Sequence, residues 1–131
     1  MAESQEQTHA QFAVFGCGGW GKNIVRTMNR LGFLHAIVDP SEHGQVTAKE
    51  LAPEVPCYGD AKDIFNNDTI KGVMIATPAE THFAIAKEAL LSGKDVYVEK
   101  PMTIDLAEAR ELVELAQHEG RLLMVGHLLE Y

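Results

Sequence analysis

Short apolar runs alternate along the chain with segments of helical spacing, and this alternation constrains the fold more than any other feature. Residues 12–16 (FAVFG) form a continuous apolar run. Residues 20–32 follow, with Ile24, Met28 and Leu31 at intervals typical of one helix face. A strand that is apolar throughout is buried on both faces, which indicates a parallel sheet with helices on either side.

The same alternation continues to the end of the chain. Further strands are expected at residues 34–39, 56–59, 72–77, 95–99 and 121–126, and further helices at 41–52, 60–68, 80–92 and 105–120. Six strands joined by five crossovers predict a doubly wound parallel sheet, the Rossmann fold, with strand order 3-2-1-4-5-6.

The last predicted helix has the clearest end signals. Asp105 is expected to cap its start, with Glu108 as the partner three residues on, and Gly120 to end it. Its spacing predicts a buried face made of Leu106, Ala109, Val113 and Ala116.

Length and composition indicate one globular domain. The chain has 131 residues, of which 46% are hydrophobic and 23% charged. Residues 1–11 are polar and lack the apolar stretch of a secretory signal, so we expect a flexible tail before a single domain at 12–131. An apolar segment, HLLEY, begins after Gly126 and stops abruptly. We therefore expect this domain to be one part of a longer protein.

Charge and cysteine content exclude several classes of function. A net charge of −8 argues against a nucleic-acid partner, which would need a basic face. No apolar run approaches the roughly 20 residues that span a bilayer. The two cysteines suit neither a disulfide framework nor a zinc site, which favours a reducing, cytoplasmic setting. No two histidines are spaced i, i+4, and no metal site is expected.

The first strand leads into a glycine-rich turn, FGCGGWG, which contains the pattern G-x-G-x-x-G and opens a helix. Gly16 would make the tight turn, Gly18 would let a pyrophosphate approach the backbone, and Gly21 would let helix and strand pack closely. The expected cofactor-binding turn comprises Gly16, Cys17, Gly18, Gly19, Trp20 and Gly21. The alternative is a glycine-rich turn without a ligand.

An acid follows the second strand at the spacing that a dinucleotide site requires. Asp39 lies 23 residues after Gly16, where a carboxylate accepts hydrogen bonds from the adenosine ribose. A carboxylate repels the 2′-phosphate of NADP, so NAD is the expected cofactor. Pro40 and Ser41 would flank the adenosine. As an alternative, Asp39 serves only as a turn or cap residue.

The fifth strand ends in VEKP, and ligands of open parallel sheets bind outside the carboxyl ends of the strands. Lys100 is therefore expected beside the nicotinamide, where it would hydrogen-bond a substrate hydroxyl and help to accept its proton. Glu99 would orient the lysine or contact the cofactor. Pro101 would fix the backbone, with a cis bond as one way to do so. An exposed ion pair is the alternative.

The neighbouring strand ends supply further candidates for the cofactor site. Thr77 and Pro78 end the fourth strand, and His82 lies one turn into the next helix. His127 follows the sixth strand. Either histidine would contact the cofactor or simply pack or cap an element.

These motifs resemble the glucose–fructose oxidoreductase and inositol dehydrogenase family (Gfo/Idh/MocA). The resemblance covers nearly the whole chain from Phe12 and rests on GCGGWGKN, VDP, ATPAETHFAIAKEALLSGKDVYVEKP and LLMVGHLLEY. The ending GHLLEY is most similar to the branch that oxidises the 3-position of nucleotide-linked sugars such as UDP-N-acetylglucosaminuronate.

The resemblance implies hydride transfer from a sugar carbon to NAD. Lys100 matches the catalytic lysine of the family and Glu99 a cofactor-contacting glutamate. The matched nucleotide-contact positions are Gly16, Gly18, Gly21, Asp39, Thr77, Pro78 and His82. Family members carry a second domain that holds the substrate and mediates oligomerisation, so this chain alone is expected to be inactive. A non-catalytic NAD(H) sensor, which would not need Lys100, and an interaction domain with vestigial motifs stay open as alternatives.

Overall fold

The structure, a computed structural model, describes residues 10–126 and contains one parallel sheet. Its strands are β1 (Phe12–Phe15), β2 (Leu34–Val38), β3 (Cys57–Tyr58), β4 (Gly72–Ile75), β5 (Asp95–Glu99) and β6 (Leu123–Gly126). They lie in the order β3-β2-β1-β4-β5-β6, and every neighbouring pair is parallel. The predicted fold class and strand order are confirmed.

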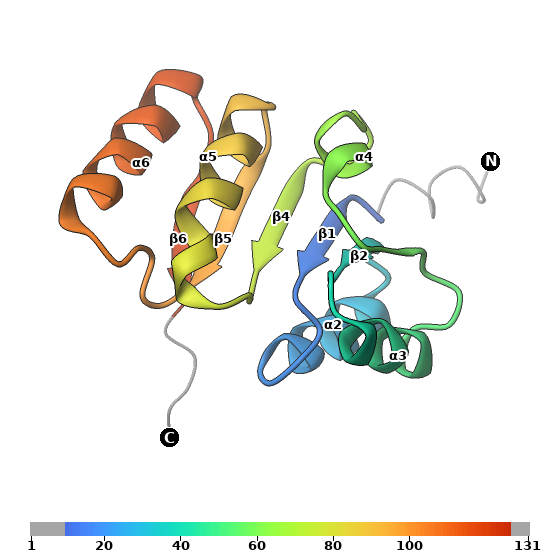
Figure 1. The fold of residues 1–131 in the computed structure, drawn as a ribbon. Coiled ribbons are helices and arrows are strands. Elements are labelled where there is room, and N and C mark those ends of the chain that lie inside the picture. The colour runs from blue at the N-terminus through green and yellow to red at the C-terminus, as the bar shows by residue number, and fades with distance from the viewer. Residues whose placement is uncertain (1–9, 127–131) are drawn as a thin grey trace.

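Helices connect the strands on both sides of the sheet. They are α2 (Gly21–Leu31), α3 (Glu42–Leu51), α4 (Lys62–Phe65), the 3₁₀ turn η1 (Ala79–Thr81), α5 (His82–Leu91) and α6 (Leu106–Glu119). Figure 1 shows α5 and α6 packed side by side near β5 and β6, while α2 and α3 lie together near β1 and β2. This arrangement places helices of the two halves on opposite faces, as a doubly wound sheet requires.

Two apolar clusters fill the space between the sheet and its helices. Alternate residues of β1 point to opposite faces, so Val14 and Phe15 belong to different clusters. Val14 packs with Val25 of α2, whereas Phe15 packs with Leu90 of α5. All four side chains are buried. Burial on both faces explains why the strands are continuously apolar in the sequence.

The predicted elements exist, and their ends differ by a few residues. β3 is only Cys57–Tyr58, and β6 begins at Leu123 rather than at residue 121. The helix predicted over 80–92 begins as η1, because the segment after Pro78 first forms a tighter turn. Gly120 ends α6 with a left-handed conformation, φ 68°, as its sequence position indicated.

The predicted buried face of α6 is confirmed at Ala116 and wrong at Leu106 and Val113. The Asp105 carboxylate caps the helix by accepting the Ala107 N–H at 2.7 Å. Leu112 and Ala116 are buried, but Leu106 and Val113 are 69% and 43% exposed. α6 packs mainly against α5, and that single neighbour selects the face that is buried.

The start of the described chain is attached to the sheet. Ala10 and Gln11, which the sequence assigned to the tail, take part in hydrogen bonds: the Lys71 N–H donates to the Gln11 carbonyl at 2.8 Å, and a His35 ring nitrogen lies 2.9 Å from the Ala10 carbonyl. Between residues 10 and 126 no helix has the length and apolar character needed to cross a membrane.

Candidate functional site

The glycine turn joins β1 to α2, and two of its three pattern glycines are required by close packing. Gly16 has φ 98°, and a Cβ there would lie 2.8 Å from the Ala76 carbonyl oxygen. A Cβ on Gly21 would overlap the Gly16 carbonyl. The first glycine therefore makes the turn, and the last lets the helix start against it.

Gly18 differs from both, because nothing in the described chain explains it. A Cβ at this position would meet no atom within 4 Å, and the φ of Gly18 is not in the left-handed region. An alanine would therefore fit the turn itself. The space that a side chain would occupy is open.

This open space belongs to a pocket of about 700 Å³ at the carboxyl ends of β1, β2 and β4. Nine residues that the sequence assigned to a cofactor site line it together: Gly16, Gly18, Gly19, Trp20, Asp39, Pro40, Ser41, Thr77 and Pro78. They come from three separate loops, and the parallel sheet brings those loops to one edge.

Sequence reasoning missed part of the lining. Gly59, Asp60 and Ala61 follow β3, and Thr81 and Ile85 come from η1 and α5. Phe15, Val38 and Ala76, at the strand ends, complete the wall. The segment after β3 was predictable, because the carboxyl end of every strand in a parallel sheet faces the same edge.

The Asp39 carboxylate organises the wall of the pocket. Its Oδ2 accepts the Cys17 N–H at 2.8 Å, and its Oδ1 accepts the Ser41 N–H and Oγ–H, each at 2.8 Å. Asp39 thus ties the end of β2 to the glycine turn. Asp39 therefore does have the alternative role of a turn residue. Its two oxygens offer about four acceptor positions, and these three hydrogen bonds leave acceptor capacity for a ligand.

Ser41 and Gly44 support this carboxylate. The Ser41 hydroxyl also accepts the Gly44 N–H at 3.0 Å and so caps α3. A Cβ on Gly44 would overlap the Asp39 carboxylate, so only glycine allows the first turn of α3 to pass beneath it.

Cys17 does not line the pocket. Its side chain is buried, and burial, together with the nearby Asp39 charge, raises the pKa of its thiol to about 11. Its contribution to the site is the backbone N–H that bonds Asp39.

His82 is buried and connects two strand ends rather than facing the pocket. Its Nε2 lies 2.8 Å from the Thr77 carbonyl, and its Nδ1 lies 2.8 Å from the Pro101 carbonyl. A ligand has no ring nitrogen of His82 left to bond. The histidine instead joins the wall of the pocket to the loop after β5.

Lys100 and Glu99 lie at the carboxyl end of β5, at the same edge of the sheet as the pocket. Lys100 is exposed, and its peptide bond to Pro101 is cis, as the sequence reading allowed. The Glu99 carboxylate accepts a hydrogen bond from the Tyr97 hydroxyl at 3.2 Å. His127, the remaining predicted site residue, lies outside the described residues.

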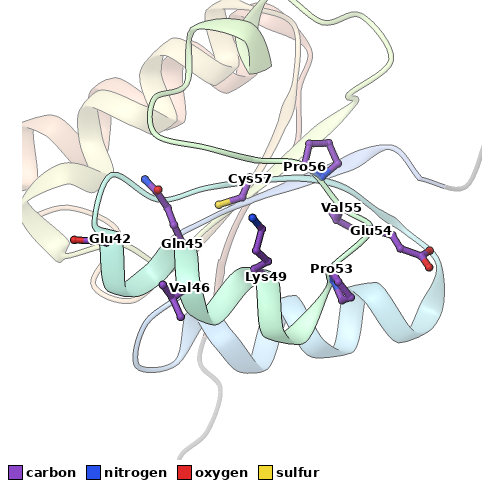
Figure 2. Close-up of a pocket in the computed structure, with 9 residues that line it drawn as sticks. All are labelled: Glu42, Gln45, Val46, Lys49, Pro53, Glu54, Val55, Pro56 and Cys57. Atoms are coloured by element: carbon purple, nitrogen blue, oxygen red, sulfur yellow. The ribbon is translucent and has the colours of Figure 1, made fainter.

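A second pocket, of about 640 Å³, lies between α3 and residues 53–57 (Figure 2). Lys49 and Cys57 line it together with Glu42 and Glu54, and it contains none of the predicted site residues. Within residues 10–126 no group of three or more His, Cys, Asp or Glu side chains is placed to hold a metal ion.

A family model described as an oxidoreductase family with an NAD-binding Rossmann fold matches residues 10–127. The chain belongs to the Gfo/Idh/MocA oxidoreductase family. The match covers the glycine turn, Asp39 and the VEKP segment in one stretch, and NAD is the cofactor of the family's Rossmann domain.

Relatives of this Gfo/Idh/MocA chain include enzymes with named substrates. It is 42% identical over 92 residues to the uncharacterized oxidoreductase YdgJ of Escherichia coli, covering 70% of this chain and 26% of YdgJ. It is 30% identical over 120 residues to a UDP-N-acetylglucosamine 3-dehydrogenase of Acidithiobacillus ferrooxidans, covering 92% and 37%.

A solved structure supports the fold. An NAD-binding oxidoreductase from Klebsiella pneumoniae superposes with a TM-score of 0.78 at 24% identity, over 88% of this chain and 33% of that one. The Gfo/Idh/MocA chain described here therefore spans roughly a quarter to two fifths of the length of the proteins it resembles.

Proposed function

We propose that this chain is the NAD-binding part of a dehydrogenase that oxidises a CH–OH group of a sugar, with Lys100 assisting the proton transfer. The observation that carries the proposal is Gly18. Gly18 has room for a side chain and no positive φ, so packing and backbone conformation do not require a glycine there; a ligand that approaches the backbone at this position explains it.

The residues around Gly18 fit a dinucleotide. The turn precedes the start of α2, where backbone N–H groups favour a pyrophosphate. The pocket continues from there to Asp39, whose remaining acceptor capacity suits a ribose hydroxyl. The lining contains no lysine or arginine among the described residues, so the charged side chains that a 2′-phosphate would meet are two carboxylates, Asp39 and Asp60. This favours NAD over NADP.

Lys100 has the proposed chemical role. Bound NAD supplies the acceptor for the substrate hydride. The Lys100 amine hydrogen-bonds the substrate hydroxyl and, in its neutral form, accepts the hydroxyl proton as the carbonyl forms. Glu99 contacts the nicotinamide end of the cofactor beside it. The position of both residues at the carboxyl end of β5, at the same edge of the sheet as the glycine turn, supports these roles.

The substrate part of the proposal draws on the relatives. The similarity to a UDP-N-acetylglucosamine 3-dehydrogenase favours a nucleotide-linked sugar, with polysaccharide biosynthesis as the setting. We infer that a second domain, absent from this chain, holds the sugar and mediates homo-oligomerisation. Both cysteines are free thiols, which supports a reducing cytoplasmic location.

Calorimetric titration with NAD⁺, NADH and NADPH tests the cofactor site, using the wild-type chain and Gly18→Ala. We expect Gly18→Ala to weaken NADH binding by at least about tenfold, because its methyl group occupies the space of the pyrophosphate. Its free energy of unfolding should change by less than about 1 kcal/mol, since the methyl group meets no atom of the chain.

Arg30→Ala, in the exposed last turn of α2, is the matched control and should leave both quantities unchanged. Unaltered NADH binding by Gly18→Ala would mean that the glycine turn is only a turn. Asp39→Asn is preferable to Asp39→Ala for testing NAD against NADP, because alanine leaves the buried Cys17 N–H without an acceptor.

Lys100→Met separates an enzyme from a sensor, and it requires the protein with its substrate domain. We expect NADH binding to persist while sugar oxidation falls by about 10²-fold or more. Oxidation that is unaffected by the substitution would remove Lys100 from the reaction.

A further inference from the structure

Tyr97 and Glu99 lie on the same face of β5, the face that belongs to the α2 side of the sheet. Val96 and Val98 point to the opposite cluster, so the alternation of the strand sets this direction. The Tyr97 hydroxyl donates to Glu99 Oε2 at 3.2 Å. Within residues 10–126 the Tyr97 hydroxyl makes no other hydrogen bond.

Gly126 completes the arrangement from the neighbouring strand. It is paired with Glu99 across β5 and β6 and is buried. A Cβ at Gly126 would overlap the Tyr97 hydroxyl and lie 3.1 Å from Glu99 Oε2. The side chains of Tyr97 and Glu99 therefore occupy the space beside the Gly126 backbone, and a side chain at position 126 would displace them.

The glycine turn lies close to this cluster. Trp20 lines the pocket of about 700 Å³ and also a smaller apolar pocket of about 310 Å³, which Tyr97 and Met74 line as well. Trp20 thus lies between the larger pocket and the side of the sheet on which Tyr97 and Glu99 lie.

We propose that Tyr97 and Gly126 are positioning residues that hold the Glu99 carboxylate at the nicotinamide end of the cofactor site. Tyr97 fixes the carboxylate by a hydrogen bond, and Gly126 provides the room for the pair. The inference rests on the proposed function, since Glu99 acts there as a cofactor contact.

The Tyr97 hydroxyl keeps its proton at neutral pH, so it stays a hydrogen-bond donor to Glu99. Burial, followed by the Glu99 charge and the hydrogen bond to Glu99, raises the pKa of the Tyr97 hydroxyl to about 12. A phenylalanine would fill the same space and lack only this donor. The hydroxyl therefore has its effect through Glu99.

The test compares the affinities of NAD⁺ and ADP-ribose, because ADP-ribose lacks only the nicotinamide. Calorimetry on the chain gives both dissociation constants for wild type, Tyr97→Phe, Glu99→Ala and the double variant. We expect ADP-ribose to bind all four equally well. We expect NAD⁺ affinity to fall about fivefold in Tyr97→Phe, as for the loss of one hydrogen bond, and the double variant to match Glu99→Ala.

Gly126→Ala gives an independent route to the same change. It should lower NAD⁺ affinity and spare ADP-ribose, and retained ADP-ribose binding shows that the variant folds. Leu122→Ala, an exposed position just before β6, is the control and should change neither affinity.

The possible failures are distinguishable. A wild-type chain that binds neither ligand overturns the proposed function and this inference with it. A wild-type preference for NAD⁺ over ADP-ribose that persists in Tyr97→Phe overturns the inference alone. Additive losses in the double variant also overturn it, because Tyr97 would then act independently of Glu99.

Discussion

The Tyr97 hydroxyl predicts how stability responds to alkaline pH. Its pKa is raised to about 12 in the folded chain and is about 10 in an unfolded one. The folded state therefore holds this proton more tightly. The resulting stabilisation is fully present below pH 10 and is lost as pH rises from 10 to 12.

Urea unfolding at pH 9, 10, 11 and 12 checks this expectation, with Tyr97→Phe as the comparison. Wild type should lose about 1–2 kcal/mol more than the variant over this range, because solvent around the half-buried ring screens part of the full effect. Cys17 and Lys94 also titrate at high pH, but they are common to both proteins and cancel in the difference. Parallel pH profiles would contradict the expectation.

Single residues also show how far the sequence predicts the site. The glycine turn was predictable because its requirements are local: Gly16 needs a positive φ, and Gly21 packs against the turn itself. The contact of Asp39 with Cys17 and the contact of His82 with Pro101 were not. Their partners are 22 and 19 residues away along the chain, and only the assembled sheet brings them together.

At the level of elements, strands were easier to predict than the buried faces of helices. A strand of a doubly wound sheet is buried on both sides, so its position alone identifies its core residues. A helix buries only the side that meets its neighbour. The sequence of α6 offers apolar residues on more than one side, and contact with α5 selects Leu112 and Ala116.

Two adjacent residues of α6 test this corrected face. Leu112→Ala should lower the free energy of unfolding by about 3 kcal/mol, because truncation of this fully buried side chain leaves a cavity. Val113→Ala should cost about 0.5 kcal/mol or less, since this side chain is exposed. Thermal or urea unfolding measures both changes. Equal losses of stability in the two variants would contradict the observed face and support the one that the sequence spacing predicted, which included Val113.

On the scale of the whole molecule, the parallel sheet separates the edge of the proposed cofactor site from the opposite edge. All six strands end at the edge that carries the glycine turn, residues 39–41, residues 59–61 and the VEKP loop. The opposite edge holds the connections before each strand. There the buried Lys94 donates to the Asn67 and Ile70 carbonyls, at 2.9 and 2.8 Å, and so joins α5–β5 to the segment before β4.

Hydrogen exchange with and without saturating NADH distinguishes the two edges. We expect added protection in residues 16–21, 39–41, 59–61 and 77–81, because each of these four separate segments contributes residues to the pocket of about 700 Å³. Binding also stabilises the whole folded chain, by about 2.7 kcal/mol when the NADH concentration is one hundred times the dissociation constant. Residues 66–71 and 92–94, at the opposite edge, should show no protection beyond this overall gain. The residues in Figure 2 serve as an internal control, because that pocket contains none of the proposed site residues. Protection confined to residues 42–57 would place the ligand there and contradict the site at the glycine turn.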